Sequence, residues 1–591
     1  MHRLEGAHNV EGFDFKNSLS AHPNVTSLKE ISLNDIATRA VFIKDKLAKA
    51  FIAIVQVGPL EYQLFIGEPK GFPGKLPWIF FFNPELHDFH NHVNYNGEIC
   101  YTVQSDGMFI NVNQPGAVLH QALSQVIEIL SGSADRNLSE LHEEFEGYWH
   151  SLPGIFEARC FFTPTQNIDQ ITALCNPVSK QNFTPRILFK EPLPEGYGYN
   201  YRLKSQQSRK AWHIPLEKKI LPPNPDAGLT PFYVRNLLDS ASESHKIQFL
   251  KSQEKKKKKG KKQTTRQCDI LLFSQMRPSG AMSLFGVVVT GTSKTPFFLS
   301  SEDKGWELIP FSIQRHNLEY ILERGGAQTS LQKRTVAIFG CGAVGSRIVE
   351  QLALSGIGKL IIFDSDDLSE DNIYRHVLGG KYIDENKAGA MAKYLKERLP
   401  YISVVPKPIK SDQWLQKKEL EGVDIIVDAT ADFTSMRAIN QNMIQDSLSV
   451  PIVYCWLEPC SIGGHSLLVD GIAEGCLECL FDNTEFGPFL RCAFLEPYQN
   501  LTKDLTGCGG VFTPFSSLDA IKTATLSTEL VIEYLLKKQT TSYSFWVGND
   551  DIAKKEGLKT TEWYKKAANK NSSEIAKRFR QKHCPACGGQ I

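Results

Sequence analysis

Three closely spaced glycines could hold a phosphate group. Gly340, Gly342 and Gly345 directly follow the apolar run from 336 to 339, and an apolar-faced helix is expected to begin after them. In this G-x-G-x-x-G context the glycines let backbone amides approach a phosphate at the positive end of the helix dipole. The three glycines alone suit any dinucleotide site, including that of a dehydrogenase.

Polar residues after the glycines separate two classes of nucleotide site. Six of them follow the apolar runs at 359–363 and 425–427: Asp364, Asp366, Asn372, Arg375, Lys387 and Asp432. Asp364 stands where a ribose hydroxyl would lie. Arg375 and Lys387 can neutralise the charge on a leaving pyrophosphate, and Asp432 can hold a metal that bridges its oxygens. Since a nicotinamide needs none of this, the set predicts ATP with Mg²⁺.

The complete pattern resembles the adenylating enzymes of the ThiF, MoeB and ubiquitin-activating family. It reads as D-x-D, then N-x-x-R, then a lysine, and then D-A-T-A-D. The resemblance implies that the three glycines form the phosphate loop and that Asp364 binds the ribose. It further implies that Arg375 and Lys387 bind the phosphates and that Asp432 binds magnesium.

Two C-x-x-C pairs could bind a metal ion: Cys476 with Cys479, and Cys584 with Cys587. Each pair can place two thiolates on one turn, and two such turns form a tetrahedral Zn²⁺ site. The alternatives are a redox C-x-x-C and four buried free thiols. Because the pairs are far apart in the sequence, we expect a zinc staple that holds the C-terminal tail to the adenylation domain, as in several members of the resembled family. Four protein ligands leave no position for an activated water, so its role is structural.

A further cysteine could receive the activated acyl group. Cys508, in LTGCGGVFTP, resembles the nucleophilic cysteine of the family, which precedes a glycine-valine, a proline and a helix. A loop cysteine ahead of a helix can have a lowered pKa and a larger thiolate fraction. Cys492, beside Arg491, is the second candidate, and Cys341 within the glycine loop is expected to pack in the core. Some members of the family stop at the adenylate.

The first part of the chain carries another candidate nucleophile, Cys100. Alternating apolar residues predict two strands joined by a proline-bearing turn, followed by a His-Asn-His element and then by NGEIC. This resembles the core of ubiquitin-conjugating enzymes, whose His-Pro-Asn element falls here on His90, Asn91 and His92. His92 therefore stands where the family's asparagine donates to the oxyanion, and Asn94 is the substitute candidate.

A conjugating-type domain ahead of an activating-type domain resembles the fused enzymes of bacterial CBASS anti-phage operons. That resemblance implies that a cGAS-like nucleotidyltransferase is activated at its C-terminus, and a ubiquitin-like protein is the alternative partner. The final acceptor would be an amine on a target. The segment QRHNLEYILERGG also looks like those fusions. In related dimeric enzymes an arginine from this segment reaches the partner's nucleotide site, so we expect a homodimer with Arg315 as the candidate. A solvated arginine is the alternative.

Three domains must position these residues. We expect a ubiquitin-conjugating-like α+β domain over 1–155, a mixed middle domain over 156–309 and a Rossmann-like α/β domain of the ThiF/MoeB type, with its zinc staple, over 310–591. Short apolar runs between proline-rich turns suggest strands in the middle domain. The run KSQEKKKKKGKKQ at 251–263 is interpreted as a solvated, flexible loop. Binding to nucleic acid is the alternative for this run; it is disfavoured because the run has no interleaved aromatic residues and the net charge is only +1.

Composition limits the class of protein. A chain of 591 residues with 42% hydrophobic content can form three or four cored domains. The opening residues contain no apolar stretch of a signal peptide, and no run approaches the roughly 20 apolar residues of a membrane span. The chain has thirteen cysteines, and those that would serve as nucleophiles and zinc ligands require a reducing compartment, which predicts the cytoplasm.

The sequence thus predicts an enzyme that uses ATP and Mg²⁺ to adenylate a protein C-terminus. The acyl group would be captured on Cys508, passed to Cys100 and conjugated to an amine. One alternative is an activator of a ubiquitin-like or sulfur-carrier protein in another pathway, which would not need the first domain. A second alternative is a non-catalytic nucleotide-binding scaffold, in which loss of Cys100 and Cys508 would be harmless.

Overall fold

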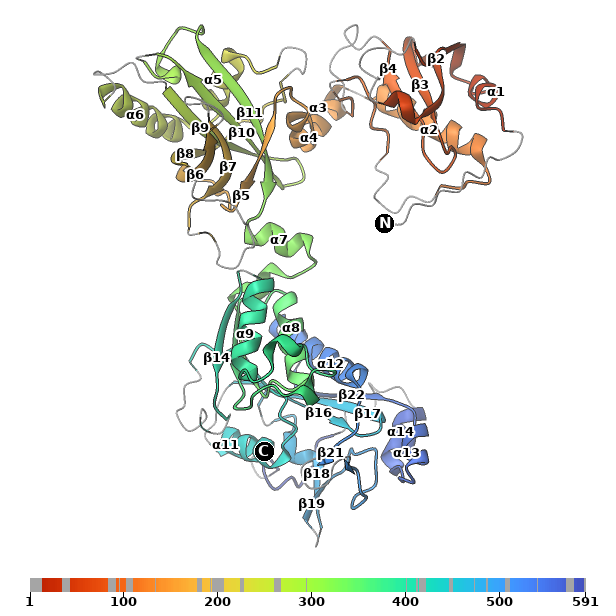
Figure 1. Ribbon diagram of the computed structural model, residues 1–591, viewed down its shortest axis with the longest axis vertical. Helices are drawn as coiled ribbons and strands as arrows, with labels where there is room; N and C mark the ends of the chain where they lie inside the picture. Colours follow the sequence, from red (N-terminus) through yellow and green to blue (C-terminus); the bar gives the residue numbers. More distant parts are fainter. Residues whose placement is uncertain are drawn as a thin grey trace. The chain divides into compact units, whose positions relative to one another are not determined.

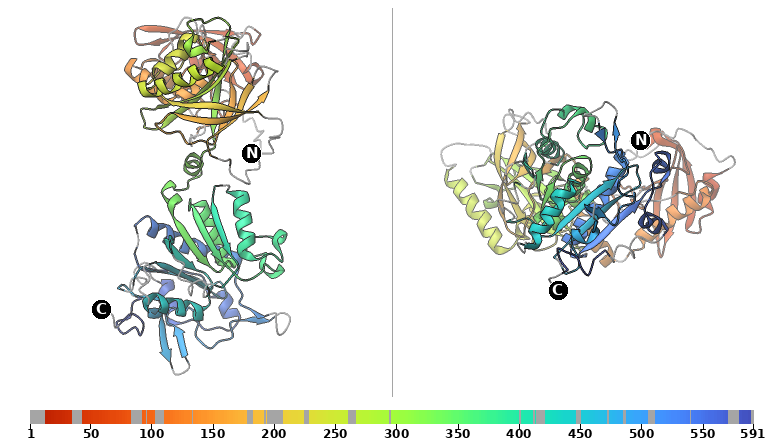
Figure 2. Two further views of the ribbon diagram at one scale, coloured as in Figure 1. Left: turned by 90° about the vertical axis from the view of Figure 1, so that its left-hand side faces the viewer. Right: turned by 90° about the horizontal axis from the view of Figure 1, so that it is seen from below.

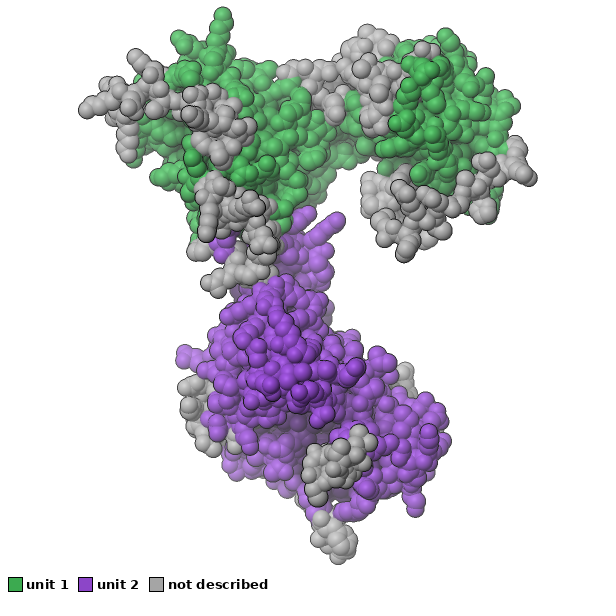
Figure 3. Space-filling view, viewed as in Figure 1, with its two compact units in different colours: residues 1–192, 202–317 green, residues 193–201, 318–591 purple. Residues whose placement is uncertain are grey.

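A computed structural model describes most of the chain, in two compact units that are treated separately (Figure 3). Unit 1 comprises residues 1–192 and 202–317, and unit 2 comprises 193–201 and 318–591. The described residues are 13–34, 43–82, 92–94, 96–102, 110–132, 134–177, 183–191, 193, 207–223, 228–259, 267–293, 295–399, 401–410, 413, 421–445, 450–471, 473–484, 487–504, 511–538, 540–569 and 579–588. None of the helices within these ranges is long and apolar enough to cross a membrane.

The first part of unit 1 is an antiparallel sheet packed against helices (Figure 1). Its elements are α1 (Phe15–Ser20), β1 (Val25–Ile31), β2 (Leu47–Val57), β3 (Leu60–Pro69), β4 (Trp78–Phe81) and α2 (Pro115–Leu130). Pro115 at the first turn of α2 suits a helix start, since an amide there would have no helical partner. Leu119, Leu123, Val126 and Leu130 recur at helical spacing and pack against buried residues of β2 and β3. This is the α+β arrangement expected for the first domain.

The rest of unit 1 is a closed barrel in the order β10-β11-β5-β7-β6-β8-β9. Its strands are β5 (Phe156–Cys160), β6 (Asp169–Pro177), β7 (Phe183–Phe189), β8 (Gln207–Pro215), β9 (Gln267–Met276), β10 (Met282–Gly291) and β11 (Trp306–Arg315). Alternate residues of β9 enter two cores: Ile270 and Leu272 face one, Leu271 and Phe273 the other. The strand is therefore apolar on both faces, as a barrel strand covered by helices must be.

Helices cover the outer face of this barrel. They are α3 (Ala134–Glu143), α4 (Phe145–His150), α5 (Pro231–Asp239), α6 (Glu243–Lys259) and the short 3-10 helix η5 (Phe297–Leu299). Phe145 and Trp149 of α4 and Phe249 of α6 join the same apolar core as β9. Figure 2 shows α6 lying across the outside of the strands.

The expected flexible loop at 251–263 is wrong for its first nine residues, which are the end of α6. Lysine is a good helix former, and the helix has already begun at Glu243 and is held to the barrel by Phe249. A charged run can therefore continue as helix because the preceding turns are anchored. Residues 260–263 lie outside the described part. The expected domain boundary at 309/310 falls within β11, a strand of the barrel.

Unit 2 is built on a seven-stranded sheet in the order β14-β13-β12-β15-β16-β17-β22. The strands are β12 (Thr335–Phe339), β13 (Lys359–Phe363), β14 (Ser403–Lys407), β15 (Ile425–Asp428), β16 (Ile452–Glu458), β17 (Gly463–Val469) and β22 (Ser542–Val547). The first five are parallel, and the last two are antiparallel to their neighbours. The strand order reverses between β12 and β15, which is where α/β sheets of this kind bind ligands.

Helices pack on both faces of this sheet (Figure 1). The helices α8 (Ala343–Leu354), α9 (Lys387–Arg398) and α12 (Ser517–Leu535) share one core, and α11 (Phe433–Gln445) joins the core of the other face. The Rossmann-like α/β class expected for the last domain is confirmed. The remaining elements are α7 (Leu318–Arg324), η6 (Thr329–Lys333), η7 (Glu370–Asn372), η8 (Gly380–Tyr382), η9 (Leu477–Leu480), β18 (Phe481–Thr484), β19 (Gly487–Leu490), β20 (Lys503–Asp504), β21 (Val511–Phe512), α13 (Asp551–Lys555) and α14 (Glu562–Asn569).

Candidate functional site

The glycine loop joins β12 to α8 with very close backbone packing. Gly340 has φ +81°, and a Cβ there would lie 3.0 Å from the backbone of Thr430. A Cβ on Gly345 would lie 1.9 Å from the Gly340 carbonyl, so any side chain would push α8 away from the loop. A Cβ on Gly342, the N-cap of α8, would meet nothing within 4 Å. The amide end of α8 is therefore open to a ligand.

A cavity of about 400 Å³ lies at the carboxyl ends of the parallel strands, beside this loop. Six of the predicted ligand residues line it: Gly340, Gly342, Asp364, Asp366, Lys387 and Asp432. They come from the ends of three neighbouring strands and from the start of α9. The topology thus brings together residues that are spread over about ninety positions of sequence, as the strand-order rule predicts.

Asp364 holds the loop in place. Its carboxylate accepts hydrogen bonds from the amides of Cys341 (2.6 Å) and Asp366 (2.9 Å). Burial raises the pKa of Asp364, and the two amides oppose that change. The residue therefore shapes the phosphate loop in addition to any contact with a ribose.

Lys387 lines the cavity and already forms an ion pair. Its Nζ lies 3.2 Å from a carboxylate oxygen of Asp366. The side chain of Lys387 is 11% exposed, whereas that of Asp366 is 70% exposed. An ion pair with so exposed a partner contributes little, so an incoming phosphate can replace Asp366 at low cost.

Asp432 has the chemistry of a ligand for a hard cation. It accepts hydrogen bonds from the amide of Thr434 (3.1 Å) and the hydroxyl of Ser435 (2.6 Å), and the Ser435 bond in particular lowers the pKa of the carboxyl. An ionised carboxylate at a phosphate cavity is the donor set that Mg²⁺ usually takes, together with water and phosphate oxygens. The residues present therefore fit Mg²⁺.

A second carboxyl lies behind Asp432. Asp428 ends β15, is fully buried and accepts from the Thr430 hydroxyl (2.6 Å) and amide (3.1 Å) through one oxygen. Its other oxygen has no hydrogen-bond partner among the described residues. Burial raises the pKa of Asp428 to about 6.

Asn372 and Arg375, also predicted to bind ATP, do not line the cavity. Asn372 ends η7, where its side chain accepts from the Ser369 amide (3.3 Å). The Arg375 guanidinium lies over the ring of Phe515, 5.1 Å from its centre. Six of the nine predicted residues thus line the cavity, and Gly345, Asn372 and Arg375 do not.

Two residues at this site were not predicted. His376 is buried; its Nδ1 accepts from the Leu378 amide (3.0 Å), so its Nε2 donates to the Cys341 carbonyl (2.7 Å). Burial lowers the pKa of His376 to about 4, so the ring is a neutral clamp on the glycine loop. Lys410, which follows β14, lines the cavity as a second cation. Neither residue stands in a recognisable motif.

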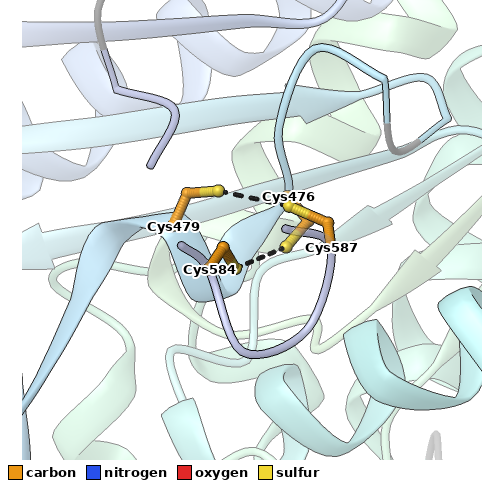
Figure 4. Close-up of side chains that lie close together, drawn as sticks. All are labelled: Cys476, Cys479, Cys584 and Cys587. Carbon is orange, nitrogen blue, oxygen red and sulfur yellow. Dashed lines mark hydrogen bonds between the residues drawn. The ribbon is translucent and has the colours of Figure 1, made fainter. Parts of the chain in front are cut away.

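The four cysteines of the two C-x-x-C pairs form one buried cluster (Figure 4). All four Sγ atoms lie within 4.8 Å of one another, with Cys476 to Cys584 at 3.8 Å and Cys479 to Cys587 at 3.5 Å. Zinc–sulfur bonds of about 2.3 Å in a tetrahedron place the sulfurs about 3.8 Å apart. The cluster therefore fits Zn²⁺, and it ties residues 579–588 to η9 within one apolar core.

The structure describes the surroundings of Cys492 and Cys341, two of the three cysteines of unit 2 considered above. Cys508 lies outside the described residues. Cys492 is 3% exposed, and burial raises the pKa of its thiol to about 12. Cys341 is fully buried, as expected of a packing residue. Burial argues against Cys492 as a nucleophile, because a reactive thiol needs access and thiolate character.

In unit 1, Cys100 lies on an exposed turn beside the four-stranded sheet. Its amide donates to the His92 carbonyl (2.7 Å), and the preceding Ile99 amide donates to the Ile79 carbonyl (2.9 Å). Short bridges between residues 93 and 99 and between 80 and 98 hold the two arms of the turn. His90 and Asn91 lie outside the described residues.

The two candidate oxyanion donors are engaged with carboxylates. The ring nitrogens of His92 face Glu144 (3.2 Å from Nδ1) and Glu140 (3.5 Å from Nε2), and its amide contacts the Tyr148 hydroxyl. Asn94 donates to the Glu98 carboxylate (3.1 Å) and accepts from the Glu98 amide (3.0 Å). His92 must exchange a partner before it can donate to an oxyanion, whereas the Asn94 amide uses only one of its two N–H hydrogens in these contacts.

The Cys100 thiol is partly buried and has two carboxylates near it. Partial burial of the sulfur raises the pKa of Cys100, and Glu98 and Glu144 raise it further. A thiolate on this turn is therefore disfavoured in the free protein.

Arg315, the candidate for reaching a partner's nucleotide site, lies at the end of β11. Its guanidinium contacts the Glu146 carboxylate and the Met282 carbonyl, and it is 19% exposed. It is therefore neither a solvated side chain nor a free one.

Two family models match separate parts of the chain. The ThiF family matches residues 314–552, and prokaryotic E2 family B matches residues 41–155. The first match covers the glycine loop, the cavity beside it and Cys508, and the second covers the Cys100 turn.

Several relatives share these parts. An "ATP-dependent ubiquitin transferase-like protein Cap2" from Pseudomonas aeruginosa is 26% identical over 39% of this chain and 42% of its own length. A Cap2 from Escherichia coli is 22% identical over 77% of this chain and 81% of its own. An "Adenylyltransferase and sulfurtransferase UBA4" from Yarrowia lipolytica is 22% identical over 44% and 57%. Of the P. aeruginosa and Y. lipolytica proteins, this chain thus spans only about half.

Among solved structures, the microcin C7 biosynthetic enzyme MccB aligns with a TM-score of 0.32 at 20% identity, over 45% of this chain and 72% of that one. The match to prokaryotic E2 family B coincides with the part of the chain that carries the Cys100 turn. The match to the ThiF family coincides with the seven-stranded sheet of unit 2. The chain therefore joins an E2-like part, which matches prokaryotic E2 family B, to an E1-like part, which matches the ThiF family.

Proposed function

We propose that this protein activates the C-terminal carboxylate of a partner protein with ATP and transfers the acyl group to an amine. The observation that carries the proposal is the presence, in one chain, of a phosphate cavity with Lys387 and Asp432 and of an exposed cysteine turn at Cys100. A nucleotide-binding scaffold has no use for the second site, and a conjugating domain alone has no use for the first.

Activation requires that a carboxylate oxygen attack the α-phosphorus of ATP. The bond to the β-phosphate oxygen breaks, pyrophosphate leaves and an acyl adenylate forms. Lys387 and Lys410 neutralise the charge that develops on the leaving pyrophosphate, and the amide end of α8 faces its oxygens. Mg²⁺ held by Asp432 would supply further charge neutralisation there.

Transfer then uses thiols. The thiolate of Cys508 attacks the acyl carbon and AMP leaves with the bonding electron pair. Cys100 exchanges with Cys508 in a step that conserves one thioester, and the amine of the acceptor finally displaces the Cys100 thiolate and loses a proton. Such an exchange is close to thermoneutral, so the aminolysis at Cys100 sets the direction.

The partner and setting are also part of the proposal. Two of the relatives are named Cap2, a ubiquitin transferase-like protein, and this name favours the anti-phage reading, with a cGAS-like nucleotidyltransferase as the activated protein. We expect a homodimer that works in the cytoplasm, where reducing conditions keep the thiols free. A structural Zn²⁺ at the four-cysteine cluster completes the metal content.

A second candidate function is activation of a ubiquitin-like or sulfur-carrier protein. It is favoured by relatives named adenylyltransferase and sulfurtransferase. That function would need the nucleotide cavity but not Cys100, so Cys100→Ala would leave it intact.

The test is to trap the acyl group in the full chain with a cGAS-like nucleotidyltransferase as partner. Cys100→Ala should accumulate the partner on Cys508 as an adduct that a thiol reductant cleaves, with no amine product. Cys508→Ala should still exchange pyrophosphate into ATP but load neither cysteine. The same partner with an amidated C-terminus is the control, since it has no carboxylate to activate.

Mixing the two variants shows whether transfer crosses between chains. Restored conjugation means that it does, and no restoration means that it stays within one chain. Normal loading of Cys100 in Cys508→Ala would show that the proposed order of the relay is wrong. Absence of pyrophosphate exchange with any carboxyl-terminal partner, cGAS-like or ubiquitin-like, would refute activation itself.

A further inference from the structure

A second cavity, of about 820 Å³, lies in unit 1 between α6 and the strands β6 and β8 of the barrel. It has no part in the proposed relay. Six of its lining residues determine its chemistry: Lys210, Trp212, Ile247, Lys251, Lys255 and Lys256. Four cations and two apolar side chains therefore surround one space.

Three of the four lysines carry unbalanced charge. Lys256 is paired with the buried carboxylate of Asp269, which also accepts from Gln253 (3.0 Å). Lys210, Lys251 and Lys255 have no acidic partner in the part of the chain that the structure describes. Because Lys251 and Lys255 are four residues apart, they share one face of α6, and Lys210 approaches from β8. The three charges converge from two elements.

An aromatic ring is fixed beside these cations. Trp212 of β8 lines the cavity and meets Phe249 of α6 edge to face, with ring centres 5.8 Å apart and planes at 86°. Phe249 is fully buried, so the indole has little freedom. The basic run lacks aromatic residues in the sequence, but the fold supplies one from a distant strand.

Helix stability explains only part of this arrangement. Lysines in the last turn of a helix interact favourably with its dipole, which accounts for Lys257. That effect fades within one turn. It does not reach Lys251, two turns before the end, and it has no bearing on Lys210 in a strand.

We propose that this cavity binds single-stranded nucleic acid. Lys210, Lys251 and Lys255 would contact phosphates, and a base would pack against the accessible part of Trp212, which is 9% exposed. Cations that follow a backbone beside an aromatic surface are the usual elements of such sites. The cavity has the size of a small-ligand pocket, so it can hold a nucleotide or two of a strand but not a protein domain.

The ligand carries more than one phosphate. Lys210, Lys251 and Lys255 are three cations around one cavity, and Glu254 is the one acidic residue from 251 to 263. A nucleoside monophosphate offers a single phosphate to these charges, whereas a strand offers one phosphate for each nucleotide. The proposal does not depend on the adenylation chemistry of unit 2.

The experiment measures binding of a fluorescein-labelled oligouridylate to the full chain by anisotropy over a range of salt concentrations. Lys251→Gln and Lys255→Gln should each weaken binding and lower the slope of log affinity against log salt by about 0.7, the value for one phosphate contact on a single strand. Lys257→Gln is the matched control, because Lys257 is an exposed lysine of the same helix that does not line the cavity. It should leave both quantities nearly unchanged.

Three results would overturn the proposal. One is no binding at physiological salt. Another is an equal loss in Lys257→Gln, which would mean that the general field of the helix binds the strand. The third is competition by polyglutamate as effective as that by unlabelled oligouridylate, which would assign the cavity to acidic proteins. Binding that persists in saturating ATP separates this cavity from the nucleotide site.

Discussion

Lys387 in the nucleotide cavity and His92 beside Cys100 are both paired with carboxylates, but releasing them differs in cost. Asp366, the partner of Lys387, is 70% exposed, so water can solvate it once a phosphate takes its place. The partners of His92 are less exposed than Asp366, at 44% for Glu144 and 27% for Glu140. Leaving these carboxylates without a partner costs more, because less water reaches them. We therefore expect Lys387 to be prepared in advance for an incoming ligand, and the Cys100 turn to lose more of its existing contacts when it is loaded.

Loss of one zinc ligand should have the largest effect. That effect should be confined to unit 2 and leave the Cys100 turn of unit 1 unchanged. Cys587→Ser should release zinc and lower the stability of unit 2 by at least about 3 kcal/mol, because thiolate ligation contributes folding free energy. For a domain of this size that corresponds to roughly 6–12 °C in Tm. Metal analysis and calorimetry measure these changes.

The Cys100 turn serves as the internal reference in that experiment. Its alkylation by iodoacetamide should proceed at the wild-type rate, since it lies in the other unit. Cys460→Ser, a buried cysteine of the same core but outside the cluster, is the matched control. Wild-type protein that contains no zinc when purified without chelator would contradict the metal assignment.

Loss of Asp432 should come next. Asp432→Ala should lower pyrophosphate exchange into ATP by more than about a hundredfold, equivalent to about 2.7 kcal/mol, because the metal charge at the transition state is lost. Glu397→Ala, which removes an exposed carboxylate paired with Lys381, should have no effect. Exchange that survives in Asp432→Ala would remove the magnesium assignment while leaving the cavity in place.

Variants of the Lys387–Asp366 pair test whether Lys387 can exchange Asp366 for a phosphate at low cost. Lys387→Gln should reduce kcat/KM for ATP by roughly tenfold or more, the usual range for a charged hydrogen bond. Asp366→Asn should change it by less than about fivefold, since an exposed ion pair contributes at most about 1 kcal/mol. Steady-state exchange kinetics give both values. Equal losses in the two variants would mean that Asp366 is itself a ligand.

The smallest effect is expected at the Cys100 turn. Glu144→Gln removes one of the charges that raise the pKa of Cys100, so that pKa should fall and the alkylation profile should move to lower pH. Burial, the larger cause, is unchanged, and the shift should be partial. Glu140→Gln, which also touches His92, is the control and should leave the profile in place. A profile that moves to higher pH in Glu144→Gln would show that Glu144 assists the thiolate.

Residues near one another in sequence, or at the ends of predicted strands, could be placed from the sequence. The glycine loop is a local pattern, and Asp364 and Asp432 follow apolar runs whose ends must meet at one edge of a parallel sheet. The fold class of unit 2 followed from the same runs. The two C-x-x-C pairs could be assigned to one metal site, because four thiolates satisfy the tetrahedral coordination of a single Zn²⁺ ion.

Other features depend on contacts that no local pattern encodes. Closure of the barrel requires β5 to pair with both β7 and β11, strands about thirty and one hundred fifty residues away. Lys410 reaches the cavity only because β14 is the edge strand beside β13. Asn372 and Arg375 occupy motif positions, yet their side chains are held by a cap and by Phe515. A motif specifies residue types, but the packing around them decides where they point.

The four-cysteine cluster also has a consequence for the order in which unit 2 matures during synthesis. Cys476 and Cys584, and likewise Cys479 and Cys587, are separated by 108 positions. A ribosome that adds about 5–20 residues per second needs roughly 5–20 s to cover that distance. Throughout this interval the first thiol pair is exposed in a nascent chain whose core lacks Phe579 and the second pair. Availability of zinc at the moment the last pair emerges therefore decides whether the nascent domain closes or is left to chaperones and proteases.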